Sequence, residues 1–313
     1  MAGSRRGRRE RASPVNGWLI VDKPSGMTST TVCNRVRRLA GNSKTGHGGT
    51  LDPLATGVLP IAFGEATKTV AYTMDARKSY RFVVRWGEAR DTDDADGEIV
   101  ETSIERPSRE EIVAGLGRFV GEIEQTPPIY SAVKIGGERA YKLARENRAA
   151  LPEPRRVRVE SFELLREIDE DSAEFEVVCG KGTYMRSLAR DLALSLGTVG
   201  HIAALRRTAV GPFREADAMT LASLEALGHI PPDFEGILPV ETALADIPAL
   251  ALSGSEAATL RSGQVVQLFR TTDLPRLGEI ADGATVRATA GGKLVAVARL
   301  EGGRVRPVRV MNH

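Results

Sequence analysis

Apolar and polar residues alternate regularly in residues 79–86. Every second position is aromatic or aliphatic, which predicts a strand with one buried face carrying Tyr80, Phe82, Val84 and Trp86. The Tyr80 hydroxyl would need a polar partner on that face. Shorter apolar runs predict further strands at 17–21, 58–63, 129–135, 155–166, 173–179 and 201–213.

Apolar residues spaced three and four positions apart predict several helices. Thr28 or Ser29 can cap a helix over 30–40, and residues 108–111 form a capping box. The helix after that box would turn its apolar residues inward, namely Ile112, Val113, Leu116, Phe119 and Val120. Further helices are expected at 66–74, 138–147, 184–196 and 255–262.

The order of these elements predicts the domain organisation. Strands and helices without regular alternation indicate an α+β domain over 15–246, built on a mixed, mostly antiparallel sheet with flanking helices. From residue 247 to 313 short apolar segments alternate with glycine-rich turns, which predicts a small β-rich domain. Residues 1–14 are arginine, glycine and serine with few apolar residues, which is typical of a disordered basic tail.

Charge is unevenly distributed along the chain, although the 313 residues carry a formal net charge of only +2. Residues 1–12 have a local charge of +4, residues 88–111 of −7 and residues 181–207 of +4. Basic faces beside an acidic lobe favour a polyanion-binding surface. Any one of these runs alone is more typical of an ordinary charged surface.

Cysteine and hydropathy patterns exclude several classes of protein. Cys33 and Cys179 are far apart and belong to no Cys/His cluster, so we expect no metal site and no disulfide. No apolar run approaches the roughly 20 residues of a membrane helix. The arginine-rich start lacks the apolar core of a signal peptide. These patterns predict a cytoplasmic protein without a membrane segment.

Residues 46–60 form an unusual loop with four glycines, two prolines and one acid, Asp52. Glycine and proline at this density indicate a loop of fixed shape. Apolar neighbours would deprive the Asp52 carboxylate of water, so its charge would need a partner. The local pattern leaves a buried structural carboxylate and a catalytic one equally open.

Residues 91–97 are rich in aspartate and superficially similar to a calcium-binding loop. The EF-hand pattern fails because Ala95 stands at a ligand position and Thr102 where the closing glutamate should be. We therefore expect an exposed loop without a metal.

Several stretches in order resemble the TruB family, the bacterial tRNA pseudouridine-55 synthases. They cover residues 16–215 and read DKPSGM at 22–27, GHGGTLDPLATG at 46–57, KSYRF at 78–82, DTDDADG at 91–97, PPIYSAVK at 127–134, KGTYMRSL at 181–188 and LRR at 205–207. The glycine-leucine-aspartate-proline core alone would be only suggestive, whereas the ordered set is specific.

The resemblance implies a fold, a reaction and three catalytic residues. It implies a catalytic domain of the pseudouridine synthase type and a C-terminal PUA-like β-barrel that binds RNA. Asp52 would be the nucleophile, Arg186 its ion-pair partner holding its pKa low, and Tyr80 a ring stacking on uracil and a candidate proton acceptor. The reaction would need no cofactor.

The resemblance also implies contacts to tRNA, through its T-arm. His47 would contact RNA beside the displaced nucleotide, Leu205 would pack on the target base, and Lys23 would serve a structural or phosphate-facing role. Tyr184, which lies in the same motif as Arg186, would also contact the RNA substrate. Residues 125–150 would be an RNA-gripping insertion whose basic residues meet phosphates, namely Lys134, Arg139, Lys142, Arg145 and Arg148. We expect a monomer.

Three other functions compete with this interpretation. A non-catalytic tRNA-binding folding chaperone could use the same scaffold. An enzyme acting on another uridine, including a guide-RNA-dependent one, would carry the same catalytic residues. A hydrolase using Asp52 and His47 finds no second carboxylate or serine at a sensible spacing.

Overall fold

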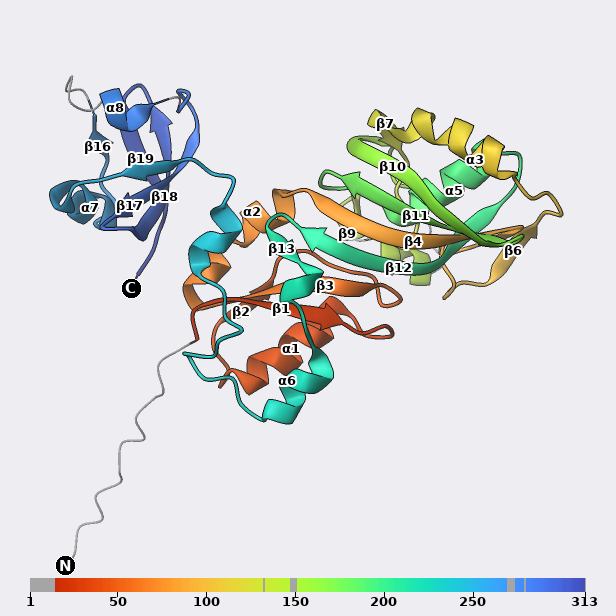
Figure 1. The fold of residues 1–313 in the computed structure, drawn as a ribbon, viewed down its shortest axis with the longest axis horizontal. Helices are drawn as coiled ribbons and strands as arrows, with labels where there is room; N and C mark the ends of the chain where they lie inside the picture. Colours follow the sequence, from red (N-terminus) through yellow and green to blue (C-terminus); the bar gives the residue numbers. More distant parts are fainter. Residues whose placement is uncertain (1–14, 132, 147–150, 269–273, 279, 313) are drawn as a thin grey trace, which may run out of the picture.

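The computed structural model describes residues 15–131, 133–146, 151–268, 274–278 and 280–312. Two sheets dominate it, one of ten strands and one of five, and the two lie side by side along the long axis of the molecule (Figure 1). The N-terminal segment of the described chain begins within the larger sheet, and the smaller sheet is built from the C-terminal residues.

The ten-stranded sheet is mixed but mostly antiparallel, as predicted. Its main path runs β14-β1-β3-β12-β4-β11-β10-β7, with β2 paired to β3 and β13 to β12. Only the β1–β14 and β3–β12 pairs are parallel. The strands are β1 (Gly17–Lys23), β2 (Thr45–His47), β3 (Thr56–Phe63), β4 (Lys78–Trp86), β7 (Gly121–Gln125), β10 (Arg155–Asp169), β11 (Ser172–Cys179), β12 (Gly200–Val210), β13 (Phe213–Arg214) and β14 (Met219–Thr220).

Helices pack on this sheet in two groups, which gives it two apolar cores. α3 (Arg109–Leu116) and α5 (Met185–Ser195) bury their apolar sides against β4, β10, β11 and β12. α1 (Ser29–Leu39) and α6 (Leu221–Leu227) pack against β1 and β3. Thr28 caps α1 by accepting from the Thr31 N–H, which leaves the Ser29 hydroxyl free for another contact.

Shorter elements connect the sheet strands. The helix expected at 66–74 divides into a 3-10 turn η1 (Gly64–Lys68) and α2 (Val70–Asp75). The remaining connections contain a hairpin of β5 (Glu88–Arg90) and β6 (Ile99–Thr102), then η2 (Gly117–Phe119), η3 (Glu215–Asp217) and η4 (Val240–Leu244).

The strand expected over 129–135 is wrong for most of its length. Only β8 (Lys134–Ile135) is a strand, paired with β9 (Glu138–Arg139) ahead of α4 (Ala140–Arg145). Residues 129–131 have no neighbouring strand, and the Tyr130 carbonyl instead accepts a hydrogen bond of 2.9 Å from Arg186. A backbone carbonyl in this apolar run therefore accepts a hydrogen bond from a side chain rather than from a neighbouring strand.

The C-terminal residues form a five-stranded sheet in the order β15-β17-β18-β19-β16. β15 and β16 are its edges within the described residues, so the expected barrel is an open half-barrel. α7 (Gly254–Arg261), with a capping box at Ser253, covers it. The other elements are β15 (Ala249–Ala251), β16 (Val266–Gln267), α8 (Leu274–Leu277), β17 (Thr285–Ala290), β18 (Lys293–Glu301) and β19 (Arg304–Val310).

Apolar contacts join the two sheets into one packed core. Leu294, Val297 and Met311 cluster with Trp18 and Phe213 of the larger sheet. The Lys68 ammonium also donates to the Val310 carbonyl at 2.8 Å, and the Asn312 N–H to Glu65 at 2.7 Å. The C-terminal sheet is thus fixed against the end of β1 and η1 by burial and by hydrogen bonds.

The residues that α3 and the segment after it bury differ from those predicted. The capping box of α3 forms as expected, but Val113 is 53% exposed and Val120 is 42% exposed, whereas Ile112 is 1% exposed. The helix ends at Leu116 and the chain continues as η2, so only a narrow stripe meets the sheet.

This stripe yields a stability prediction from two adjacent residues. Ile112→Ala should lower the free energy of unfolding by about 2–5 kcal/mol, because it leaves a cavity in the core. The matched variant Val113→Ala should change it by no more than about 0.5 kcal/mol. Urea denaturation measures both, and equal losses would contradict the burial pattern of α3.

Candidate active site

The loop carrying Asp52 is held in place by hydrogen bonds from α1. The Ser29 hydroxyl accepts from the Leu51 N–H at 2.8 Å and donates to the Leu51 carbonyl at 3.1 Å. The Ala55 N–H donates to the Asp52 carbonyl, closing a tight turn. Leu51 is 4% exposed, so its side chain anchors the loop in the core. Ser29 was expected only as a helix cap, and its clamping role is a contact that local sequence does not reveal.

Lys23 supports the other side of the same turn. Its ammonium, fully buried, donates to the carbonyls of Pro24, Met27 and Pro53 at 2.9, 2.6 and 3.1 Å. Burial lowers the pKa of Lys23 to about 8, while the negative charge of Asp52 raises it. All three N–H bonds are used by the protein, which favours the structural role over the phosphate-facing one.

Arg186 forms the predicted ion pair with Asp52. Its Nε lies 3.0 Å from Asp52 Oδ2. The arginine side chain is 5% exposed and that of Asp52 35%, so the carboxylate faces the open side of the pair. The other guanidinium nitrogens donate to the carbonyls of Thr92 and Tyr130 at 2.9 Å each. Four groups, of which Asp52, Thr92 and Tyr130 are three, therefore fix Arg186 at the start of α5. One edge of the Asp52 carboxylate stays accessible.

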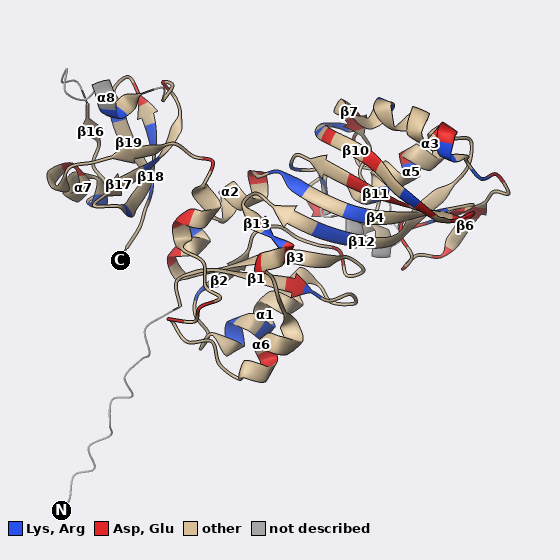
Figure 2. Ribbon diagram, in the orientation of Figure 1, with Lys and Arg blue, Asp and Glu red and all other residues tan. Residues whose placement is uncertain are grey.

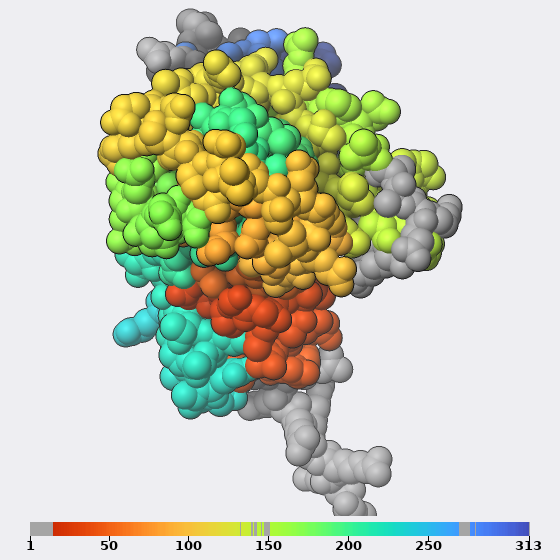
Figure 3. All heavy atoms as spheres, turned by 90° about the vertical axis from the view of Figure 1, so that its right-hand side faces the viewer, coloured from red at the N-terminus to blue at the C-terminus, as the bar shows by residue number. Residues whose placement is uncertain are grey.

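The fourth of those groups, Asp94, is a site residue that the sequence did not indicate. Asp94 Oδ2 lies 3.6 Å from Arg186 Nε, and the Asp94 side chain is 7% exposed. The neighbouring Asp93 pairs with Arg190 at 2.8 Å. The expectation of an exposed loop at 91–97 is therefore wrong at its centre, because two arginines of α5 draw these carboxylates inward. Figure 3 shows the orange and gold segment around residues 90–110 directly above the red N-terminal segments.

The environment of Asp52 shifts its pKa upward. Burial raises the pKa of the Asp52 carboxyl, the positive charge of Arg186 lowers it, and the negative charge of Asp94 raises it again. The sequence predicted a net lowering by Arg186. Burial and the second carboxylate outweigh that single cation, so Asp52 is protonated at a higher pH than an ordinary aspartate.

Tyr80 lies on β4 beside this loop. β12 places Arg207 directly opposite it, so that the two side chains are neighbours on one face of the sheet. Burial raises the pKa of Tyr80, whereas Arg207 lowers it and the charge of Asp52 raises it. The ring packs against the apolar cluster containing Leu51. Tyr80, Arg186 and Asp52 thus meet at one place although they come from three distant segments.

His47 and Leu205 border the same loop. His47 ends β2 just before the loop, is half-buried, and its Nδ1 has no hydrogen-bond partner among the described residues. Burial lowers the pKa of its imidazole. Leu205 on β12 is 8% exposed and belongs to the same apolar cluster as Leu51 and Phe82.

The remaining predicted contact residues lie farther along the surface. The Tyr184 backbone is bracketed by the Gln125 amide at 2.8 and 3.1 Å, and its ring lies under the Arg155 guanidinium at 4.8 Å. Lys134 on β8 is exposed and paired in register with Arg139 on β9. Arg148 and the side chains of Arg139, Lys142 and Arg145 lie outside the described parts of the chain.

In the ribbon of Figure 2, acidic positions gather around β6, and basic positions occur along β4 and β12. Among the described residues, no three histidine, cysteine, aspartate or glutamate side chains gather into a metal site. Within the same residues no helix is long and apolar enough to cross a membrane.

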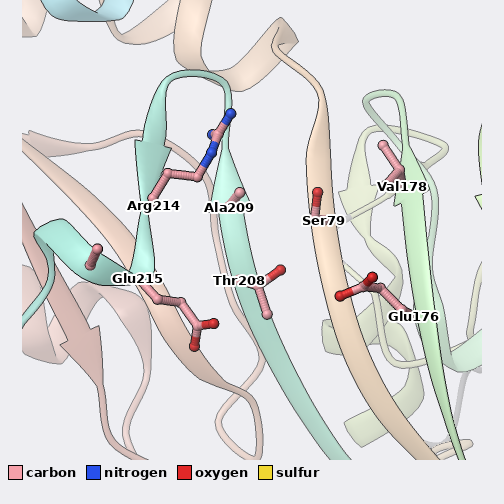
Figure 4. A pocket seen from close by; sticks show the side chains of 8 residues that line it. Ser79, Glu176, Val178, Thr208, Ala209, Arg214 and Glu215 are labelled. Atoms are coloured by element: carbon pink, nitrogen blue, oxygen red, sulfur yellow. The ribbon is translucent and has the colours of Figure 1, made fainter. Parts of the chain in front are cut away.

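Two surface pockets lie beside the site rather than in it. One, of about 340 Å3, contains Ser79, Glu176 and Thr208 and opens on the sheet face opposite Tyr80, because Ser79 and Tyr80 alternate along β4 (Figure 4). The other, of about 360 Å3, lies between β1 and α6 and includes Asp22 and Arg206, which form an ion pair of 2.9 Å. Neither contains Asp52.

The arrangement around Asp52 suits nucleophilic chemistry. An accessible carboxylate lies against a buried guanidinium that fixes its orientation, with a phenol beside it. Such a carboxylate can form a covalent intermediate with an electrophilic carbon. The phenol offers a flat surface and a group that can take part in proton transfer.

Known proteins share both this fold and this sequence. The N-terminal domain of TruB family pseudouridylate synthases matches residues 37–185, and the C-terminal domain of tRNA pseudouridylate synthase B matches residues 186–245. The tRNA pseudouridine synthase B of Rhodospirillum rubrum is 55% identical over 97% of this chain and 99% of its own length. That of Gluconacetobacter diazotrophicus is 54% identical over 97% and 100%.

Solved structures agree with the sequence comparisons. An H/ACA RNP bound to a substrate RNA containing 2′-deoxyuridine holds a chain that superposes with a TM-score of 0.71 at 26% identity, over 95% of this chain and 85% of that one. An archaeal box H/ACA sRNP Nop10-Cbf5 complex gives 0.70 at 25% identity, over 97% and 93%. The chain, from its Asp52 loop to its two matched domains, belongs to the TruB family of pseudouridylate synthases.

Proposed function

We propose that this protein is a tRNA pseudouridine synthase that isomerises uridine-55 in the T-arm through a covalent intermediate on Asp52. The ion pair between the accessible Asp52 carboxylate and the buried Arg186 carries this proposal. The relatives named tRNA pseudouridine synthase B support tRNA as the substrate.

The proposed reaction rearranges one nucleotide and needs no other reactant. Asp52 attacks the ribose or the uracil ring, and the bond between C1′ and N1 breaks. The uracil turns, C5 bonds to C1′ and the bond to Asp52 breaks, which regenerates the carboxylate. The C5 proton leaves, and N1 gains a proton. In this proposal Tyr80 stacks on the ring and is the candidate acceptor of the C5 proton.

Access to the nucleotide requires that it leave its stack in the folded tRNA arm. Extruding a base costs a few kcal/mol, which stacking and apolar side chains offset. His47 lies at the entrance to the Asp52 loop and would contact RNA beside the displaced nucleotide, and Leu205 would pack on the uracil.

The domain organisation fits one enzyme with two RNA contacts. In this proposal residues 15–246 form the catalytic domain, and the insertion at 125–150 grips RNA through Lys134 and Arg139. Residues 247–313 form a PUA-like domain that binds RNA on its own surface, fixed to the catalytic domain through Met311.

Asp52→Asn tests the proposed nucleophile. The variant should release no tritium from tRNA labelled at uridine C5, because an amide cannot form the ester, yet it should bind tRNA with near-normal affinity. Asp75→Asn, a matched change at an exposed carboxylate that pairs with Lys181, should release tritium normally. Undiminished release by Asp52→Asn would refute the nucleophile. Binding without release in the wild-type protein would favour a folding chaperone.

The second carboxylate, Asp94, makes the pH profile a test of the site. Because Asp94 raises the pKa of Asp52, Asp94→Asn should lower that pKa and keep Asp52 ionised at lower pH. The acidic limb of kcat/KM should therefore move to lower pH. Asp96→Asn, at an exposed position of the same loop, should leave that limb in place. A shift to higher pH in Asp94→Asn would contradict the assigned electrostatics.

A further inference from the structure

The side chain of Arg207 is almost fully buried, although the sheet itself does not require a charged residue at this position. It lies on β12, is 1% exposed, and its neighbour Arg206 points to the opposite face. Among the described residues its hydrogen-bond partners are three carbonyl oxygens rather than a carboxylate. A cation kept in the interior without an ion pair is costly, so its position calls for an explanation.

The guanidinium of Arg207 binds both ends of the loop that carries Asp52. Its Nη2 donates to the Gly49 carbonyl at 3.0 Å and its Nη1 to the Thr50 carbonyl at 3.4 Å, before Asp52 in the chain. Its Nε donates to the Val58 carbonyl at 2.8 Å, after Asp52. One planar group therefore fixes the separation of the two ends of this loop.

Tyr80 is the direct neighbour of Arg207 across the sheet. The two residues are paired in register between β4 and β12, so their side chains lie side by side on the same face. The Asp52 loop, which joins β2 to β3, and the Tyr80 phenol on β4 thus share Arg207 as a neighbour.

Two glycines of the loop lie next to Arg207. A Cβ on Gly57 would lie 2.2 Å from the Arg207 carbonyl oxygen, so β3 and β12 pair here only with glycine at position 57. Gly49, whose carbonyl accepts from Arg207, has a φ of +135°, which favours glycine at this end of the loop.

We propose that Arg207 is the positioning residue of the site, which holds the Tyr80 phenol and the Asp52 loop in one fixed relation. The proposal rests on the proposed function, because it assigns Tyr80 and Asp52 to one reacting nucleotide. Lysine could not replace it, since a point charge cannot reach three carbonyls with planar geometry.

Several charged and titratable groups surround Tyr80 and Arg207. Those that face Tyr80 are Arg207 on β12, Cys179 on β11 and Asp52 in the loop. Three further groups lie near the Arg207 charge, namely Lys23, His47 and Lys78.

A double-mutant cycle tests the proposal. Arg207→Lys should lower the single-turnover rate of pseudouridine formation about 100-fold, because a displacement of about 1 Å of the reacting groups has that effect. The Kd for tRNA should stay within about twofold. In a Tyr80→Phe background the same change should cost about tenfold less, because the phenol contact is already lost. Arg206→Lys, at an ion-paired arginine on the other face, should leave the wild-type rate within about twofold.

An equal fold-loss in both backgrounds, or a loss confined to the Kd, would overturn the proposal. If Arg207→Lys does not fold, the cycle is run with Gly49→Ala, which strains the positive φ at the loop end that Arg207 binds while keeping the guanidinium, and the same two outcomes decide. Full activity of Asp52→Asn would instead refute the proposed nucleophile and leave the coupling between Arg207 and Tyr80 as a separate result.

Discussion

The structure depends on how one buried guanidinium, that of Arg186, is satisfied. Burying a cation is costly unless its charge is paired, and removing one member of a buried ion pair costs about 3–5 kcal/mol. The charge of Arg186 is offset by two carboxylates near its Nε, and its terminal nitrogens donate to two backbone carbonyls. Those partners come from the Asp52 loop, the loop after β5 and the segment after β7, so α5 assembles three separate parts of the chain around one side chain.

Burial of these charges explains the electrostatics of the site. The Asp52 carboxyl has lost water on most sides, which raises its pKa, and Arg186 limits the rise while Asp94 adds to it. Lys23 and Arg207 support the backbone of the same loop through carbonyl oxygens instead of carboxylates. The loop therefore keeps a fixed shape, and its single acid stays accessible to an incoming nucleotide.

Period-2 and capping signals predicted much of the fold because they depend on neighbours in sequence. The β4 alternation, the cap at Thr28 and the capping box at Ser108 are confirmed. Predictions failed where tertiary contacts decide. The Tyr130 carbonyl binds Arg186 instead of a strand, and the acidic loop at Asp94 is drawn inward by the same arginine.

The site divides in the same way. Family motifs predicted the pairing of Asp52 with Arg186, which is confirmed. In contrast, no local sequence pattern indicated that Ser29 and Arg207 support the loop. Their roles arise from backbone atoms that only folding brings near. The predicted direction of the Asp52 pKa shift was also wrong, because a sequence motif does not show how deeply a carboxyl group is buried.

Locating the product in RNA tests the central claim most directly. The purified protein would be incubated with an unmodified tRNA transcript, and pseudouridine would be mapped at single-nucleotide resolution. The account predicts one pseudouridine, at position 55, and none in a transcript with cytidine at that position. Pseudouridine elsewhere, or none at all with the wild-type protein, would contradict it.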